Sequence, residues 1–292
     1  MMLAEFEEDA QLNRAGGGMT GASVTVTNVS KNFWVSVNRM HQQVRALQDV
    51  TIDIPAGEIT AITGISGCGK TTLLRIIVGL ERASSGSVKV AGREINGPGY
   101  DRGMVFQHAE LLPWRNALAN VEFGLEVKGV PAKERRATAE YYLEFVGLKD
   151  AMQRRPDQLS GGMKQRVGLA RALAIEPSVL LMDEPFGALD AQTREVLQGE
   201  LLRIHQSTGR TIIIVTHDID EAVVLADRVV ILAPSPGRVE TILDINIPRP
   251  RQSPVEIRTT SEFVEKRHRL WELLQATQPG SIEDGADFDQ GD

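Results

Sequence analysis

The stretch TAITGISGCGKTTLLRIIVGL, residues 60–80, decides the fold of this chain. An apolar run leads into a glycine-rich turn with one lysine, and a run with helical spacing follows. Glycine adopts backbone angles that are closed to other residues, so a turn containing Gly64, Gly67 and Gly69 can direct its N–H groups toward one point. The following helix adds its positive end at the same place. This strand, turn and helix therefore predict a binding loop for phosphate.

Residues 64–71, GISGCGKT, match the pattern G-x-x-x-x-G-K-[ST] of a nucleotide-binding loop. In such a loop Lys70 reaches the β- and γ-phosphates, and the hydroxyl of Thr71 binds Mg²⁺. The alternative is a glycine-rich turn with an exposed lysine, which the strand before it and the helix after it disfavour. We therefore expect ATP and Mg²⁺ as cofactors. The residues expected to contact the nucleotide here are Gly64, Ser66, Gly67, Cys68, Gly69, Lys70, Thr71 and Thr72.

Polar side chains follow three other predicted strands. Asp183 and Glu184 end the run VLLMDEP, residues 179–185, Gln107 ends GMVFQ, and His217 ends TIIIVTH. The carboxyl ends of parallel strands meet at one edge of the sheet, where nucleotides bind. We expect Thr71, Asp183 and Gln107 to hold the metal, and Glu184, His217 and Gln107 to take part in catalysis. Helix capping or a solvated turn is the alternative for the acid pair.

A second anion site is predicted at LSGGM, residues 159–163. Ser160 is placed to cap a helix, while Gly161 and Gly162 expose backbone N–H groups at its positive end. If this site and the first loop bind one nucleotide, a head-to-tail dimer of two identical chains is the natural solution, and it closes with two ATP molecules. A plain capped helix start is the alternative.

With these motifs in this order, residues 23–245 resemble the ATP-binding subunit of ABC transporters. GISGCGKTT resembles Walker A, VFQ the Q-loop and LSGGM the signature, although Met163 stands where the family commonly has glutamine or glutamate. VLLMDEP resembles Walker B, GALD the D-loop, and VTHD the segment of the switch histidine.

The resemblance implies a role for each matching residue. Glu184 is the catalytic base, His217 contacts the γ-phosphate, and Gln107 links the metal to a helical insertion. Ser160 and Gly162 contact the ATP of the partner subunit, and Asp190 communicates across the dimer. Phe33 stands where the family usually stacks an aromatic ring on adenine. Its neighbour Trp34 and the long stretch WVSVNRMHQQVR leave open which ring stacks.

Three stretches narrow the resemblance: LLPW at 111–114, PFGALD at 185–190 and APSPGRV at 233–239. With these stretches the sequence resembles the ATP-binding subunits of importers of nitrate, taurine, alkanesulfonate, bicarbonate and cyanate. This implies an integral membrane permease as partner, a solute-binding protein as indirect partner, and a place at the cytoplasmic face of the inner membrane. LLPW is open to two interpretations, as core of the helical insertion or as a surface that faces the permease.

The expected fold class is α/β, a P-loop NTPase of the ABC ATPase kind. It combines a mostly parallel core sheet, an antiparallel β subdomain and an inserted α-helical subdomain at about 108–172. Residues 1–21 are interpreted as a disordered leader and residues 22–246 as the ATPase domain. Residues 247–292 are expected to form an extension with one helix and an acidic, disordered end.

Composition restricts the partners. The net charge is −7 and aromatic residues make up 5%, so nucleic acid is not an expected partner. Three alternatives remain: a soluble ABC protein acting on ribosomes or DNA, a phosphotransferase, or an importer ATPase for a different solute. A single cassette with a short insertion argues against the first, and LSGGM has no use in the second.

Overall fold

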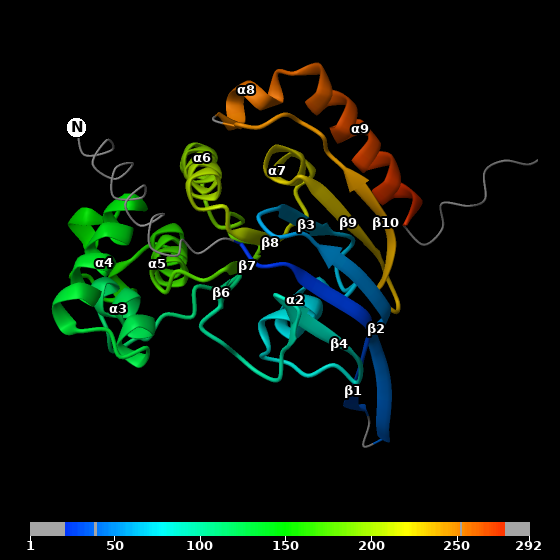
Figure 1. The fold of residues 1–292 in the computed structure, drawn as a ribbon, viewed down its shortest axis with the longest axis horizontal. Helices are drawn as coiled ribbons and strands as arrows, with labels where there is room; N and C mark the ends of the chain where they lie inside the picture. The colour runs from blue at the N-terminus through cyan, green and yellow to red at the C-terminus, as the bar shows by residue number, and fades with distance from the viewer. Residues whose placement is uncertain (1–20, 38–39, 252, 278–292) are drawn as a thin grey trace, which may run out of the picture.

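A computed structural model of the chain describes residues 21–37, 40–251 and 253–277. Figure 1 shows two sheets with helices around them. Most of the predicted leader and acidic end lie outside these residues. Within them, no helix is both long enough and apolar enough to cross a membrane.

The larger sheet is the predicted, mostly parallel core. Its strand order is β10-β9-β3-β8-β7-β6, and only the outer strand β10 pairs antiparallel to its neighbour. The strands are β3 (Ile59–Thr63), β6 (Arg102–Val105), β7 (Val179–Asp183), β8 (Thr211–Val215), β9 (Arg228–Ala233) and β10 (Arg238–Asp244). All five side chains of β3, β7 and β8 are buried, because both faces of the sheet are covered.

Two hydrophobic cores lie on opposite faces of this sheet. In β7, Val179 and Leu181 join one core while Leu180 and Met182 join the other, as alternation along a strand requires. The first core is closed by α2 (Lys70–Val78) and a smaller antiparallel sheet of order β2-β1-β4-β5. That sheet consists of β1 (Val24–Val37), β2 (Met40–Ile54), β4 (Ser85–Val90) and β5 (Arg93–Glu94).

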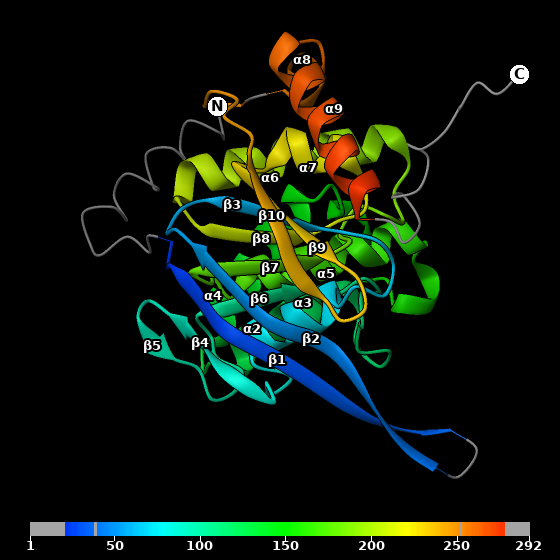
Figure 2. The ribbon, with the colours of Figure 1, turned by 90° about the vertical axis from the view of Figure 1, so that its right-hand side faces the viewer.

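The strands β1 and β2 form one long antiparallel pair. Their pairing continues through Phe33↔Val44 and Trp34↔Gln43 to Val37↔Met40, so the described residues of the stretch WVSVNRMHQQVR form an extended hairpin. Figure 2 shows this hairpin projecting from the body of the protein.

The helical insertion lies at one side of the molecule, away from α9 (Figure 1). It contains α3 (Ala117–Val127), α4 (Ala132–Phe145) and α5 (Gly161–Ala174), with short 3₁₀ helices at Lys149–Ala151 and Pro156–Gln158. Pro131 takes the cap position of α4, one residue before the first helical position that its type favours.

The remaining helices cover the other core. They are α6 (Ala191–Thr208), α7 (Ile219–Leu225), α8 (Pro254–Arg258) and α9 (Ser261–Ala276). The prediction of one helix after residue 247 is wrong, because α8 precedes α9. Ser253 caps α8 and Pro254 opens it, but five residues are too few to show a helical period. Phe263 and Leu270 of α9 are buried.

The C-terminal helices are joined to α6 and α7 by ion pairs. Arg258 of α8 contacts Glu195 of α6 at 2.7 Å, and Arg267 of α9 contacts Asp220 of α7 at 2.6 Å. Asp220 lies in the first turn of α7, and Glu195 lies just beyond the first turn of α6. The extension therefore holds α6 and α7 at the ends that are nearest to Asp190 and His217.

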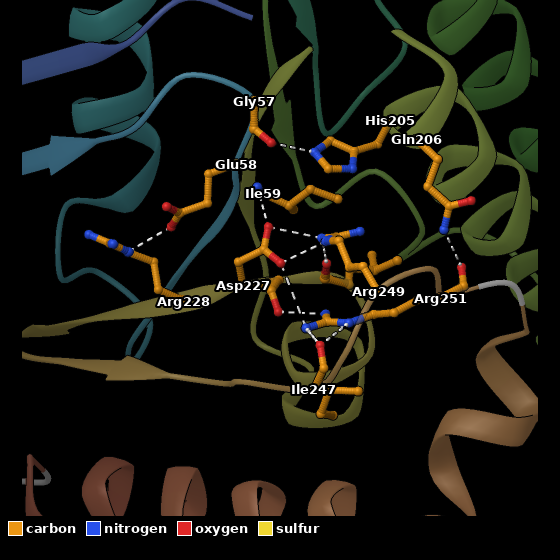
Figure 3. A network of polar contacts seen from close by, with 12 residues as sticks. Gly57, Glu58, Ile59, His205, Gln206, Asp227, Arg228, Ile247, Arg249 and Arg251 are labelled. Atoms are coloured by element: carbon orange, nitrogen blue, oxygen red, sulfur yellow. Dashed lines mark hydrogen bonds and ion pairs between the residues drawn. The ribbon is translucent and has the colours of Figure 1, made fainter. Parts of the chain in front are cut away.

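A polar network fastens the start of the extension to the core sheet, and Figure 3 shows it. Asp227 accepts hydrogen bonds from the Ile59 amide at 2.9 Å and from Arg249 at 2.8 and 2.9 Å. Arg251, 2% exposed, donates to the carbonyls of Val224, Ala226 and Ile247. Burial raises the pKa of Asp227, but Arg249, the Ile59 amide and Arg251 together outweigh it, and the net pKa is lowered.

Candidate active site

The phosphate loop joins β3 to α2 and lies tightly against its neighbours. Gly64 and Gly69 have φ angles of 151° and 92°, which L side chains rarely adopt. A Cβ at Gly64 would lie 2.5 Å from the Leu232 carbonyl oxygen, and one at Gly69 would lie 2.6 Å from Leu47 Cδ2. Glycine is therefore required at both positions for backbone angle and for space.

Lys70 and Thr71 open α2. The Lys70 side chain is largely buried, and its Nζ donates to the carbonyls of Gly64 at 2.7 Å and Ile65 at 3.0 Å. The Thr71 hydroxyl donates to Asp183 Oδ1 at 3.2 Å. Burial raises the pKa of Asp183, and Glu184 adds to the rise, while the bond from Thr71 opposes it. Thr72 is half-buried on the same helix.

Cys68, one of the residues expected to contact the nucleotide, turns its side chain into the core. The side chain is 0% exposed and belongs to the core under the loop. Burial raises the pKa of its thiol. Only the backbone of Cys68 remains for a ligand, because its small, apolar side chain fills the core. Ser66 and Gly67, by contrast, are exposed.

The structure brings Glu184, Gln107 and His217 together. Gln107 Nε2 donates to Glu184 Oε2 at 3.1 Å, and His217 Nδ1 lies 3.1 Å from Glu184 Oε1. The three residues follow β7, β6 and β8, so the carboxyl ends of adjacent strands converge as predicted. Glu184 has a φ of 47°, an uncommon conformation for a residue other than glycine. The site thus presents a carboxylate held from two sides at the edge of the sheet.

Ser160 and Asp190 cap helices. Ser160 accepts a hydrogen bond from the Met163 amide at 3.3 Å, at the start of α5, and Asp190 accepts one from the Thr193 amide at 2.9 Å, at the start of α6. The bonds from Thr193 lower the pKa of Asp190. Gly161 and Gly162 are the first residues of α5. Gly162 is close enough to Leu189 that an added Cβ would lie 3.1 Å from Leu189 Cδ2.

Two residues at the site were missed by the sequence analysis. Gln165 of α5 is 4% exposed and donates to the Phe106 carbonyl at 3.0 Å, which ties the second anion site to the segment of Gln107. Arg194 of α6 donates to the Leu189 carbonyl at 3.2 Å and to Asp218 at 3.5 Å. It thereby joins the segment of Asp190 to that of His217. No local pattern marks either residue, because both contacts span distant parts of the chain.

Phe33 and Trp34 point to opposite faces of β1, as neighbours on a strand do. Phe33 is half-buried, with Lys31 Nζ 4.8 Å from the centre of its ring, while Trp34 is 70% exposed. The adenine contact of Phe33 stays a prediction.

The donor atoms at the site fit a Mg²⁺–nucleotide complex. The Thr71 hydroxyl and the Asp183 carboxylate are oxygen ligands of the kind that Mg²⁺ prefers, and Gln107 offers an amide oxygen. Magnesium sites at nucleotides use few protein ligands, since phosphate oxygens and water supply the rest.

Glu221 is a buried carboxyl group next to the His217 segment. It is 4% exposed, and its Oε1 has no hydrogen-bond partner. Burial, followed by the nearby Asp218, raises the pKa of Glu221 from 4.5 to about 8. Between these two pKa values the Glu221 carboxyl group is protonated in the folded state and ionised in the unfolded state. Stability from this group is complete at low pH and falls as pH rises from about 4.5 to about 8.

Glu221→Gln is expected to flatten the dependence of stability on pH. The amide cannot ionise. The free energy of unfolding of the variant should therefore lack the decrease, on the order of a few kcal/mol, that Glu221 causes between pH 5 and pH 8. Urea unfolding at several pH values measures this, with Glu265→Gln at an exposed position of α9 as the control. Parallel curves for Glu221→Gln and the unchanged protein would contradict the assignment.

A phosphate loop at the carboxyl edge of a parallel sheet, with an acid pair at the end of β7, the next strand but one, defines a P-loop ATPase. The family model described as ABC transporter matches residues 47–187. An uncharacterised ABC transporter ATP-binding protein of Methanocaldococcus jannaschii is 49% identical over 86% of this chain and 90% of its own length. This chain belongs to the family of ABC transporter ATP-binding proteins, and it is an ATP-binding ATPase of that family.

Two further relatives have names that state a solute. The nitrate import ATP-binding protein of Synechocystis sp. is 46% identical, with 82% of this chain and 92% of the relative covered. The taurine import ATP-binding protein of Escherichia coli is 47% identical, with 79% and 93% covered. Among solved structures, a dimeric bacterial ABC transporter cassette superposes with a TM-score of 0.70 at 35% identity, covering 76% of this chain and 98% of its own.

Proposed function

We propose that this protein is the ATP-hydrolysing subunit of an importer for a small anionic solute of the nitrate, taurine, alkanesulfonate, bicarbonate or cyanate type. The observation that carries the proposal is the 46–47% identity to nitrate and taurine import subunits over about four-fifths of the chain. The protein then acts at the cytoplasmic face of the inner membrane, bound to a permease that receives solute from a binding protein.

The site residues divide the chemistry among them. The loop N–H groups and Lys70 bind the phosphates, while Thr71, Asp183 and Gln107 would hold Mg²⁺. The metal, when bound, neutralises charge on the phosphates. Glu184 accepts a proton from the attacking water, and His217 donates a hydrogen bond to the γ-phosphate and orients Glu184 across their 3.1 Å contact.

The second anion site supports a dimer. Ser160, Gly161 and Gly162 stand at the positive end of α5 and would face the ATP of the partner subunit. Asp190 lies next to them through the contact of Leu189 with Gly162. The dimeric solved cassette, with which most of this chain superposes, supports the same arrangement. ATP then closes two copies of the chain upon each other, and hydrolysis releases them.

The LLPW stretch offers a surface to the permease. Asn120, 0% exposed, bonds to Leu112 at 2.8 and 3.2 Å and to the Arg115 carbonyl at 3.1 Å. These bonds fix the backbone on both sides of Trp114, whose side chain is 69% exposed. A large aromatic side chain on a rigid, exposed turn is typical of a residue that dominates an interface.

Trp114→Ala is expected to separate hydrolysis from transport. The site described above does not include Trp114, so basal ATP hydrolysis by the isolated subunit should be unchanged. Binding to the permease should weaken roughly 30-fold, the effect of losing about 2 kcal/mol at an interface centre. Trp271→Ala on α9, where the side chain is also exposed, is the control. If Trp114→Ala bound the permease and coupled hydrolysis to transport as the unchanged protein does, this surface would not be the contact with the permease.

The function itself is tested by reconstitution. The subunit is purified with the permease that it captures, placed in vesicles with the binding protein, and assayed for ATP hydrolysis with nitrate, taurine, bicarbonate and cyanate. Stimulation by one of these anions supports the proposal. If none of the four solutes stimulated the intact complex, it would be an importer for another solute, and capture of ribosomes or DNA would reject an importer.

A further inference from the structure

The turn between β9 and β10, residues 234–237, is fastened to a strand of the other sheet. The Gly237 amide donates to the Ala46 carbonyl at 3.0 Å, and the Gln48 amide donates to the Gly237 carbonyl at 2.8 Å. Gly237 and Leu47 thus form an isolated parallel bridge between the β9–β10 turn and β2. This turn is the PSPG part of the stretch APSPGRV, to which the site described above assigns no role.

Gly237 lies directly against the phosphate loop. A Cβ at this position would lie 2.1 Å from the Cys68 carbonyl oxygen and 3.0 Å from the Ala46 carbonyl oxygen. Both neighbours are backbone atoms, so neither can rotate away as a side chain could. The φ angle of Gly237 is not in the left-handed region, and space alone excludes a side chain here.

The same segment of β2 supports the loop at a second point. Leu47, whose backbone neighbours hold Gly237, also packs under Gly69, where an added Cβ would lie 2.6 Å from Leu47 Cδ2. Gly69 is the cap residue of α2, and Lys70 is its first residue. Cys68, between these supports, has its side chain in the core. The two supports, β2 and the β9–β10 turn, therefore fix the position of the loop and with it the start of α2.

We propose that Gly237 is a positioning residue for nucleotide binding. It lets the β9–β10 turn lie under the Cys68 carbonyl, so that the loop N–H groups and the start of α2 keep the orientation that binds phosphate. Gly237 contacts no nucleotide and acts through Cys68. The inference rests on the proposed role of the loop in binding ATP. A side chain at 237 must either lift the loop or break the two hydrogen bonds to β2.

Gly237→Ala tests this with a matched control. Gly97→Ala is the control, because Gly97 has no positive φ and an added Cβ there meets nothing within 4 Å. Two quantities are measured: the rate at which a maleimide labels Cys68 without nucleotide, and the affinity for Mg²⁺–ATP. Cys68 is the single cysteine and is 0% exposed, so labelling reports the loop.

Gly237→Ala should label roughly tenfold faster and bind Mg²⁺–ATP roughly tenfold more weakly, while Gly97→Ala should match the unchanged protein. Unchanged labelling and affinity in Gly237→Ala, or equal changes in Gly97→Ala, would overturn the proposal. If the unchanged protein bound no ATP, the proposed function would fail, yet the labelling rates would still show whether Gly237 sets the position of the loop.

A second measurement needs no variant and covers the case in which Gly237→Ala does not fold. Addition of Mg²⁺–ATP to the unchanged protein should slow hydrogen exchange at the amides of Gly237 and Gln48, because a bound phosphate fixes the loop above them. The Ile95 amide, bonded to Val88 at 3.0 Å in the outer part of the small sheet, is the reference. No slowing, or equal slowing at Ile95, would count against the proposal.

Discussion

Glu184→Gln is expected to reduce ATP turnover about 10²–10⁴-fold, the usual contribution of a positioned general base. Glutamine has nearly the shape of glutamate and keeps an oxygen toward His217 or Gln107, but its amide accepts no proton from water. ATP binding should persist, because Lys70 and the loop are unchanged. The variant should therefore accumulate as an ATP-bound dimer, which size-exclusion chromatography with ATP detects while phosphate release measures turnover.

Glu110→Gln is the control for this experiment, since Glu110 is exposed and lies three residues beyond Gln107. It should hydrolyse ATP at the normal rate. If Glu184→Gln also did so, another residue would be the base. If it failed to bind ATP, the carboxylate would have a role in binding that the 3.1 Å contacts to Gln107 and His217 do not explain.

Asp227→Ala is expected to cost roughly 2–4 kcal/mol of unfolding free energy, because it leaves buried guanidinium groups without their counter-charge. The side chain of Arg251 is 1% exposed and those of Asp227 and Arg249 about a quarter exposed, so water replaces little of what is lost. The pKa of Asp227 is lowered by folding, so this stability is present above the ordinary pKa and is lost as pH falls through the lowered one. Urea unfolding measures the change.

Asp220→Ala provides the comparison. Asp220 also pairs with an arginine, Arg267, but their side chains are 40% and 55% exposed. Exposed pairs contribute at most about 1 kcal/mol, so this variant should unfold nearly as the unchanged protein does. Equal losses in the two variants would show that burial is not what gives the Asp227 network its strength.

The elements that could be predicted are those whose signal is local. The loop of residues 64–71 is predicted by glycines, a lysine and a hydroxyl at fixed spacing between a strand and a helix. The strand-end residues Glu184 and His217 follow runs that are apolar on both faces, so their meeting at one sheet edge follows from parallel pairing alone. The importer subgroup followed from the short stretches LLPW, PFGALD and APSPGRV, and relatives with nitrate and taurine in their names support it.

What could not be predicted depends on contacts between distant residues. Arg194 reaches Asp218 and Gln165 reaches Phe106 across gaps in sequence that no periodicity describes. The side chain of Cys68 lies in a motif that suggests ligand contact, but its direction depends on the packing of the loop over the core. The helix α8 is too short to be recognised, and the antiparallel pairing of residues 34–37 with residues 40–43 could be seen only with both strands in place.

The attachment of the C-terminal helices has a mechanical consequence. Two ion pairs link the extension to the N-terminal parts of α6 and α7, close to Asp190 and His217. A shift of either segment on nucleotide binding would therefore be passed on to α8 and α9. The pair of Asp220 with Arg267 breaks at little cost, since both side chains already meet solvent, but the buried Phe263 and Leu270 keep α9 on the core. Movement at the ATP site would thus change the position of the outer surface of the extension.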